Sequence, residues 1–371
     1  MARSTLSCCF VVKNEEQQIA QALDCITVLA DEIIIVDTGS TDGTLSVVNS
    51  WTRKYNAQNA VKLFSVGNQF HDTDGDFDFG GAKTHAIRQA TKDFVMWLDA
   101  TDRVTNQRDV KKQFIDITNK NKNVYIAMPT ALSKNFAFVR TRIGPRVQSS
   151  MVGRIHEYMA FTNATELTRH FIGSPIDNHK EQRNLTRNIR QLLKEWAIRP
   201  TARICFYIAL TYREMHDTKN SLEWFRRRVY THSFRNEFDE EYFKSMESIA
   251  ELIVDQIKGP QADLELYDMA TQMIEHNPHR VEGHYYMARY HMRKEEYEKA
   301  QEYLRKYRGC KKPKTYKLWL NGAIYNGKAI LNALEACKTA LKYKDVLQPD
   351  EILDLHPPTR STFTRGDGQY Y

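Results

Sequence analysis

Two short apolar runs in the first hundred residues each end abruptly in aspartate. Ile33–Val36 is followed by Asp37, and Phe94–Leu98 is followed by Asp99, with Asp102 close behind. Such runs predict buried strands of a parallel sheet. In open α/β sheets, ligands bind at the carboxyl ends of the strands. The pattern therefore predicts a pocket of nucleotide size lined by these three carboxylates.

Carboxylates gathered at one pocket are costly unless a cation neutralises them. A divalent ion that bridges a diphosphate would do so, because Mg²⁺ or Mn²⁺ takes one or two carboxylates together with phosphate oxygens. The alternative is structural: Asp99 or Thr101 could cap a helix, and an α/β domain can end a strand in aspartate without a ligand there. The residues alone leave both interpretations open.

Strands and helices alternate around these aspartates, which predicts right-handed crossovers and a largely parallel sheet. The predicted strands are 6–12, 33–37, 61–66, 94–98 and 123–128, and the predicted helices are 16–29, 44–54, 82–91 and 110–120.

Two loops in this half carry charge. The acidic loop between Gly67 and Gly81 holds four aspartates, but Gly81 stands where a calcium-binding EF-hand needs glutamate, so we expect a solvated, mobile loop. The basic segment 133–150, with Arg140, Arg142 and Arg146, predicts either a flexible flap over the site or an ordinary surface loop.

The composition predicts a two-domain globular protein. The chain has 371 residues, a net charge of +7 and six scattered cysteines without CxxC pairs. These features favour reduced thiols and a cytoplasmic location, with neither a membrane span nor a signal peptide. So mild a charge permits an acidic partner without demanding one.

The second half is predicted to be helical and repetitive. Residues 183–196 predict an amphipathic helix, and aromatic and alanine positions then recur at 41, 38 and 35 residues. The clearest unit, 278–308, follows the tetratricopeptide pattern of small and large residues. We expect a domain at 1–180, a linker helix at 181–199, a helical domain at 200–345 and a tail at 346–371. The helical domain could also pair two chains as a homodimer.

Basic residues cluster in this half at 226–228, 305–308 and 311–314. Solvated helix faces are the usual explanation, and the alternative is contact with an acidic acceptor or nucleic acid.

Together these segments resemble the family 2 glycosyltransferases of the GT-A fold, an α/β (Rossmann-like) class, and most of all the subgroup in which tetratricopeptide-like repeats follow. The resemblance covers roughly residues 5–200. It is carried by the segments Val11-Val-Lys-Asn-Glu-Glu16, Asp31-Glu-Ile-Ile-Ile-Val-Asp-Thr-Gly-Ser-Thr-Asp-Gly-Thr44, Asp78-Phe-Gly-Gly-Ala-Lys83, Trp97-Leu-Asp-Ala-Thr-Asp102 and Gly153-Arg-Ile-His-Glu157.

The resemblance implies roles on the donor side. The loop of Val12, Lys13, Asn14 and Glu15, together with Asp37, would hold the uracil and ribose of a uridine-diphosphate (UDP) sugar. Lys83, where the subgroup usually has arginine, would meet the diphosphate, with Arg146 as a further donor contact from the basic segment.

The implied metal is Mn²⁺ or Mg²⁺. Thr101 stands where the family's Asp-x-Asp pattern has its second aspartate, so metal dependence stays open. The candidate ligands are Asp99, Thr101, Asp102, His156 and His179.

On the acceptor side, Glu157 is the candidate base, with Asp177 in reserve. His156 could instead contact a phosphate, and His179 could face the diphosphate. A plain structural role for both histidines stays open.

The predicted activity is inverting transfer of a sugar from a UDP-sugar donor to a macromolecular acceptor: a protein, peptide or glycan. One alternative keeps this chemistry but acts on a modified nucleic-acid base. The other is a repeat scaffold that binds nucleotide without catalysis.

Overall fold

The computed structural model describes residues 3–58, 60–133, 136–159, 164–167, 172–173, 185–234, 239–306, 310, 322–325 and 327–343. The chain forms two compact units that divide between Gln191 and Leu192, inside helix α5 (Leu185–Ile198). Each unit is described by itself.

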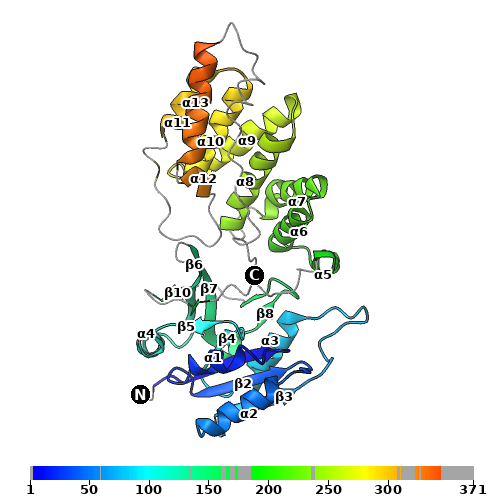
Figure 1. Cartoon of the computed structure of the whole chain (residues 1–371), viewed down its shortest axis with the longest axis vertical. Coiled ribbons are helices and arrows are strands. Elements are labelled where there is room, and N and C mark those ends of the chain that lie inside the picture. Colours follow the sequence, from blue (N-terminus) through cyan, green and yellow to red (C-terminus); the bar gives the residue numbers. More distant parts are fainter. Residues whose placement is uncertain are drawn as a thin grey trace. The chain divides into compact units, whose positions relative to one another are not determined.

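The first unit is built on a mixed sheet with the strand order β3-β2-β1-β4-β7-β6-β11-β5, and β10 pairs with β6 (Figure 1). Its strands are β1 (Leu6–Val12), β2 (Glu32–Asp37), β3 (Val61–Ser65), β4 (Phe94–Leu98), β5 (Arg103–Val104), β6 (Tyr125–Ser133), β7 (Phe136–Pro145), β10 (Ala164–Glu166) and β11 (Ile172–Gly173). A separate ribbon pairs β8 (Met151–Val152) with β9 (Tyr158–Met159).

Four parallel strands place Asp37 and Asp99 at the same end of the sheet, where the carboxyl ends of the strands lie. Strand β1 pairs in parallel with β2 on one side and β4 on the other, and β3 continues the parallel set beyond β2. Val12 lies opposite Asp37, and Phe10 lies opposite Leu98. Adjacent strands lie ~4.8 Å apart, so β2 and β4 end roughly 10 Å from each other. Asp37, the last residue of β2, and Asp99, the residue after β4, therefore lie at the same end of the sheet, with β1 between their strands.

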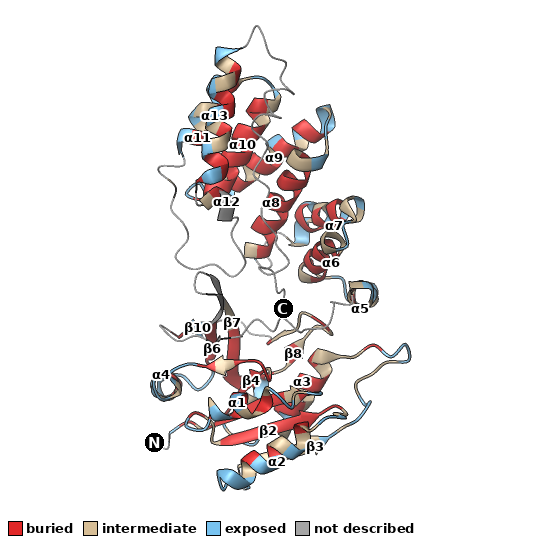
Figure 2. Ribbon diagram, in the orientation of Figure 1, coloured by how far each residue is buried: buried red, intermediate tan, exposed pale blue. Residues whose placement is uncertain are grey.

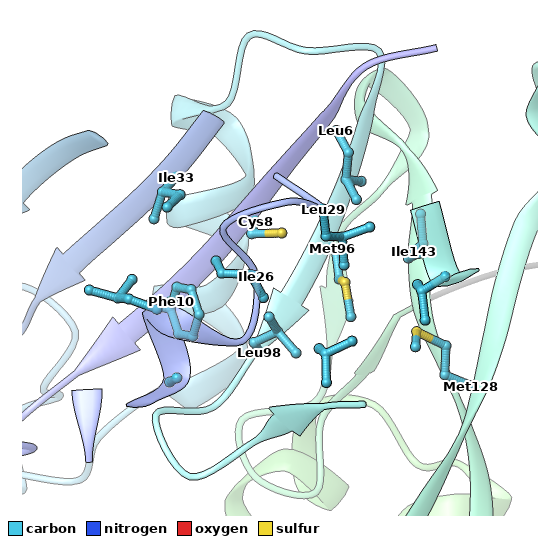
Figure 3. Packing of buried hydrophobic residues seen from close by; sticks show 14 of the residues in the cluster. Leu6, Cys8, Phe10, Ile26, Leu29, Ile33, Met96, Leu98, Met128 and Ile143 are labelled. Atoms are coloured by element: carbon cyan, nitrogen blue, oxygen red, sulfur yellow. The ribbon is translucent and has the colours of Figure 1, made fainter. Parts of the chain in front are cut away.

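Alternate side chains of the strands fill two cores, one on each face of the sheet. Figure 3 shows the first, where Phe10, Ile26, Met96 and Leu98 pack together. The second contains Cys9, Ile34, Val36, Val95 and Trp97. These residues pack against helix α3 (Phe79–Gln89). Because both faces are covered, β2 carries six consecutive buried residues (Figure 2).

The flanking helices follow the 3.6-residue periodicity of their apolar positions. They are α1 (Ile19–Asp24), α2 (Thr44–Lys54), α3 (Phe79–Gln89) and α4 (Gln107–Lys120). Helix α2 buries Val48 and Trp51, and α4 buries Val110 and Phe114. Asp78 caps α3 by accepting a hydrogen bond from the Gly81 N–H at 2.8 Å.

Two local predictions were wrong. The helix expected over 16–29 is regular only across α1, and turns complete the rest. The basic segment 133–150 is no flap in its described part: β7 pairs antiparallel with both β4 and β6. Val139 and Ile143 flank the two arginines in a strand whose residues 141–145 are all buried, and the turn residues at 144–145 obscured this strand.

The second unit is helical throughout its described residues, as expected for a repeat domain. Its helices are α6 (Ala202–Glu214), α7 (Thr218–Tyr230), α8 (Asp239–Gln256), α9 (Pro260–His276), α10 (Val281–Arg293), α11 (Tyr297–Arg305), α12 (Gly322–Tyr325) and α13 (Lys328–Lys342). Helices α6 to α11 form three consecutive packed pairs. In the first pair, Asp217 caps α7, and the Ser221 hydroxyl donates to the carbonyl of Ala209 across the two helices.

The first basic cluster of this unit is not an open positive face. Arg226 pairs with Glu265, Arg227 lies over the Trp224 ring, and Arg228 is buried and donates to the carbonyl of Phe234. Part of the 305–308 cluster and all of 311–314 lie outside the described residues. None of the helices that the structure describes is both long and apolar enough to cross a membrane.

Glu32 should contribute measurably to the stability of the first unit. Its carboxylate accepts from Ser7 and Thr91 and pairs with Lys62 at 2.6 Å. Burial opposes ionisation, but Lys62 and these hydrogen bonds outweigh it and lower the pKa of Glu32 to about 2. We expect Glu32→Gln to lower the unfolding free energy at pH 7 by about 1–3 kcal/mol.

The stabilisation is fully present above the unfolded-state pKa and is lost as pH falls through the folded-state pKa. The difference between wild type and Glu32→Gln should therefore shrink as pH falls from about 4.5 toward 2. Urea unfolding at pH 7 and pH 3 measures this, with exposed Asp116→Asn as the control. An equal difference at both pH values would contradict the prediction.

Candidate active site

Two loops at the carboxyl edge of the sheet are joined by hydrogen bonds. The Asn14 N–H donates to the Ser40 hydroxyl at 3.0 Å, and the Asn14 side-chain oxygen accepts from the Thr41 N–H at 2.8 Å. The Glu15 N–H donates to the Thr44 hydroxyl at 2.8 Å. Asn14 has a left-handed backbone, with φ of 56°, which asparagine tolerates better than most residues. The loops after β1 and β2 are therefore fixed to each other.

Val12 and Asp37 are the last residues of β1 and β2, from which these loops begin. The Thr38 N–H donates to the Val12 carbonyl at 3.0 Å. The buried Asp37 carboxylate accepts from the N–H groups of Gly39 at 3.2 Å and Ser40 at 3.1 Å. Lys13 and Asn14 are exposed in the first of these loops. The predicted nucleoside-side residues are thus brought together.

A buried ammonium connects the two predicted halves of the site. Lys83 projects from the first turns of α3, and its Nζ lies 2.8 Å from Oδ1 of Asp99 and 2.7 Å from Oε1 of Glu157. Burial alone would lower the pKa of Lys83, but the two carboxylates outweigh it and raise that pKa. The ammonium is therefore charged, and the third of its three N–H donors is not used by these contacts.

Asp99 is the more accessible of the two aspartates after β4, with 35% of its side chain exposed. Burial raises its pKa, but Lys83, Arg142 and Arg140 outweigh this effect and lower it. Asp99 is therefore an ionised carboxylate at neutral pH.

Asp102 has a different role. Its carboxylate lies 3.0 Å from the Arg142 guanidinium and accepts from the Asp99 N–H at 2.9 Å. Arg142 is 1% exposed, and it stacks 3.9 Å from the Trp97 ring. Asp102 thus shapes the turn that presents Asp99, and Arg142 holds it there.

Glu157 lies in a loop between β8 and β9, which allows it to face Lys83. Gly153 and His156 in this loop have left-handed backbones, with φ of 95° and 52°. A Cβ atom on Gly80 would lie 2.0 Å from the Gly153 carbonyl oxygen. The glycine at position 80 therefore lets α3 approach this loop closely enough for Lys83 to reach Glu157.

The structure separates Arg146 from the other predicted site residues. Arg146 donates to the Lys92 carbonyl at 3.0 Å, next to the beginning of β4, whereas Asp99 follows the end of β4. The reason is that β7 runs antiparallel to β4, so the residue after β7 returns to the opposite edge. The interpretation of Arg146 as a donor contact was wrong. Asp177 and His179 lie outside the described residues.

Arg142 and Trp97 shape the site, but the spacing of the sequence did not single them out. Arg142 was grouped with the other arginines of the basic segment. Arg142 lies on β7, next to β4, where it pairs with Asp102. This position depends on the strand order. The alternation of Arg142 with apolar neighbours is typical of a half-buried strand with exposed polar residues, so this local signal did not indicate a buried arginine.

A divalent ion has one accessible carboxylate among the described candidates. Asp99 keeps its second oxygen, whereas Asp102 is engaged by Arg142 and Thr101 is buried. One carboxylate together with donor phosphates and water is a sufficient ligand set for Mg²⁺ or Mn²⁺. Such an ion therefore fits at Asp99, but without a ligand contributed by Asp102.

The sequence of residues 7–190 matches the family described as glycosyl transferase family 2. Residues 7–190, just under half of the chain, therefore form a domain of that family. The predicted fold class, a GT-A α/β domain with a mostly parallel sheet followed by an all-α domain, is confirmed.

Two curated proteins are similar to this chain over part of their length. An uncharacterized glycosyltransferase of Rickettsia prowazekii is 26% identical over 122 residues, which are 33% of this chain and 36% of the relative. A TPR repeat-containing protein of Synechococcus elongatus is 28% identical over 103 residues, 28% of this chain and 22% of the relative. The matched segments thus span well under two thirds of either relative.

Solved structures are similar at low identity. S. aureus TarS 1-349 in complex with UDP-GlcNAc is 13% identical, with a TM-score of 0.39, over 79% of this chain and 91% of that chain. Glucosyl-3-phosphoglycerate synthase from Mycobacterium tuberculosis with Mn²⁺, UDP and phosphoglyceric acid is 18% identical, with a TM-score of 0.27, over 36% and 44%. At this level of similarity, the roles of individual residues in this chain follow from its own geometry.

Replacing Lys83 should destabilise the first unit. Lys83→Met leaves two carboxylates close together without their shared cation, so we expect a loss of about 1–3 kcal/mol at pH 7. This is less than for a fully buried pair, because Asp99 is partly exposed. The loss should shrink toward pH 4, where the carboxylates can take up protons. Thermal unfolding at both pH values measures it, and the exposed Lys120→Met serves as control. A loss that grows as the pH falls would contradict the interpretation.

Proposed function

We propose that the chain is a glycosyltransferase that catalyses inverting transfer of a sugar from a UDP-sugar donor to a macromolecular acceptor. The observation that carries the proposal is the Lys83 ammonium, shared between Asp99 on the donor side and Glu157 on the acceptor side. One cation thereby connects a diphosphate subsite to a candidate base.

The donor half is supported by the two joined loops and Asp37. The Asp37 carboxylate accepts two backbone hydrogen bonds, and it has further lone pairs to accept from ribose hydroxyls or from the uracil N3–H. The exposed Lys13 and Asn14 would border the base. Lys83 would direct its unused N–H at the diphosphate as a point charge.

The acceptor half is supported by the placement of Glu157. In the proposed step, Glu157 takes the proton of the acceptor hydroxyl, thiol or amide as that atom bonds to the anomeric carbon. The bond between this carbon and the diphosphate oxygen breaks, and UDP leaves with the electron pair. Lys83 stabilises the charge that develops on the diphosphate.

A divalent ion held by Asp99 would, when bound, add charge stabilisation for the leaving diphosphate. Asp102 and Arg142 would keep Asp99 oriented, whether or not an ion is present.

For the acceptor we propose a protein, peptide or glycan. The paired and buried side chains at 226–228 give no support to a nucleic-acid base as acceptor. A scaffold that binds UDP without turnover is a distinct outcome of the experiments below.

Asp99→Ala should abolish turnover. The substitution removes the accessible carboxylate and leaves Lys83 with Glu157 as its only carboxylate partner. Purified protein is incubated with a panel of UDP-sugars, with and without Mn²⁺, and release of UDP is followed. We expect slow release by wild type and none by Asp99→Ala. Binding of UDP without release from any donor or acceptor would instead establish the scaffold.

Glu157→Gln should separate binding from chemistry. Glutamine keeps the size and still accepts from Lys83, but it cannot take a proton, so kcat should fall by about 10²–10⁴-fold. Affinity for UDP, measured by calorimetry, should stay within about threefold, because Glu157 lies on the acceptor side. Unchanged kcat would remove Glu157 as the base.

A further inference from the structure

The acidic loop predicted to be solvated is an ordered turn. Its residues 72–78, named here the acidic turn, include three carboxylates, Asp72, Asp74 and Asp76, whose ligand atoms lie within 4.8 Å of one another. Asp72 accepts from the N–H groups of Asp74 at 3.0 Å and Asp76 at 2.9 Å. Asp76 is only 1% exposed. The expectation of a solvated loop therefore agrees with the exposed residues 73–75 but not with the buried Asp76.

Two arginines compensate this charge. Arg154 lies 3.0 Å from the Asp72 carboxylate and also donates to the Asp76 carbonyl at 3.3 Å. Arg190, in α5, binds both oxygens of the Asp76 carboxylate, with its Nε at 2.8 Å. A bidentate pair of this kind fixes direction as well as distance. The turn is thus an arginine-bound element of the fold.

Arg154 connects this turn to the candidate base. It stands three residues before Glu157, in the same loop, and its carbonyl accepts from the Phe79 N–H at 2.9 Å, at the start of α3. One turn further along α3 is Lys83, the partner of Glu157. The side chain of Arg154 therefore holds the acidic turn, while its backbone holds the helix that carries Lys83.

We propose that Arg154 is a positioning residue, supported by Arg190 through Asp76, that holds Glu157 against Lys83 for the transfer step. The inference rests on the proposed function for its catalytic consequence. It gives a role to the arginine of the Gly-Arg-Ile-His-Glu segment, which pairs with Asp72 of the acidic turn. Without these contacts, the loop with left-handed residues at 153 and 156 loses the side-chain hydrogen bonds that Arg154 makes to the acidic turn.

The test compares four variants of the full chain. Arg154→Met and Arg190→Met remove the guanidinium and keep much of the side-chain volume. Arg154→Lys keeps the charge, and Arg88→Met, at an exposed position of α3, is the matched control. Three quantities are measured: kcat for UDP release, affinity for UDP, and hydrogen exchange of the peptide that covers 151–159.

We expect Arg154→Met to lower kcat by about 10- to 100-fold, because a small displacement of a reacting group costs this much. UDP affinity should stay within about threefold, and exchange over 151–159 should speed up by about tenfold. Arg154→Lys should recover part of kcat, since lysine restores a charge but not the forked geometry. Arg190→Met should act in the same direction but less, because Arg190 is half exposed and acts through Asp76.

Three results would overturn the proposal. They are unchanged kcat and exchange in Arg154→Met, an equal loss of kcat and UDP affinity, and equal effects of Arg88→Met. If wild type releases no UDP from any donor, the proposed function fails and the catalytic part of this inference fails with it. The exchange measurement then still decides whether Arg154 orders the loop that carries Glu157.

Discussion

The first unit depends on one buried cation. Lys83 stands between Asp99, which follows a central strand, and Glu157, which lies in a loop more than fifty residues later. Without an ammonium there, two carboxylates would face each other in a partly buried pocket, which is costly. Three neighbouring residues support this contact. Gly80 allows α3 to approach the loop, Asp78 caps the helix, and Arg142 pairs with Asp102.

Four charged side chains lie around the end of β4: Lys83, Asp99, Asp102 and Arg142. They differ in whether they are accessible to a ligand or hold the local structure. Asp99 is partly exposed and is available to a ligand, whereas Asp102 is buried and is paired with Arg142. Two carboxylates three residues apart thus have different environments and opposite pKa shifts, lowered for Asp99 and raised for Asp102, where burial is the largest cause. This separation leaves Asp99 as the accessible carboxylate even though Thr101 stands where the family's pattern has an aspartate.

Charge compensation also governs the parts of the chain that look like binding sites but are already satisfied. The acidic turn resembles a cation site, yet Arg154 and Arg190 pair with two of its three carboxylates, Asp72 and Asp76. The arginines at 226–228 resemble a basic patch, yet Glu265 and packing against aromatic rings and a backbone carbonyl engage them. In both cases the opposite charge comes from a residue distant in sequence, so a scan for charge runs along the chain overestimates the number of free sites.

The sequence by itself determined the local elements. Apolar runs set β1, β2 and β4, the 3.6-residue pattern set α2, and the abrupt aspartates located the carboxyl edge with Asp37 and Asp99. Those signals are local, because burial on both faces and helix periodicity are written into neighbouring residues. Only the tertiary structure decided that β7 is a strand antiparallel to β4, which sends Arg146 to the wrong edge and brings Arg142 to Asp102. Likewise, the pairing of Lys83 with Glu157 and of Arg190 with Asp76 joins residues 74 and 114 positions apart. Strand order and loop approach fix such pairs, and neither leaves a periodic trace along the chain.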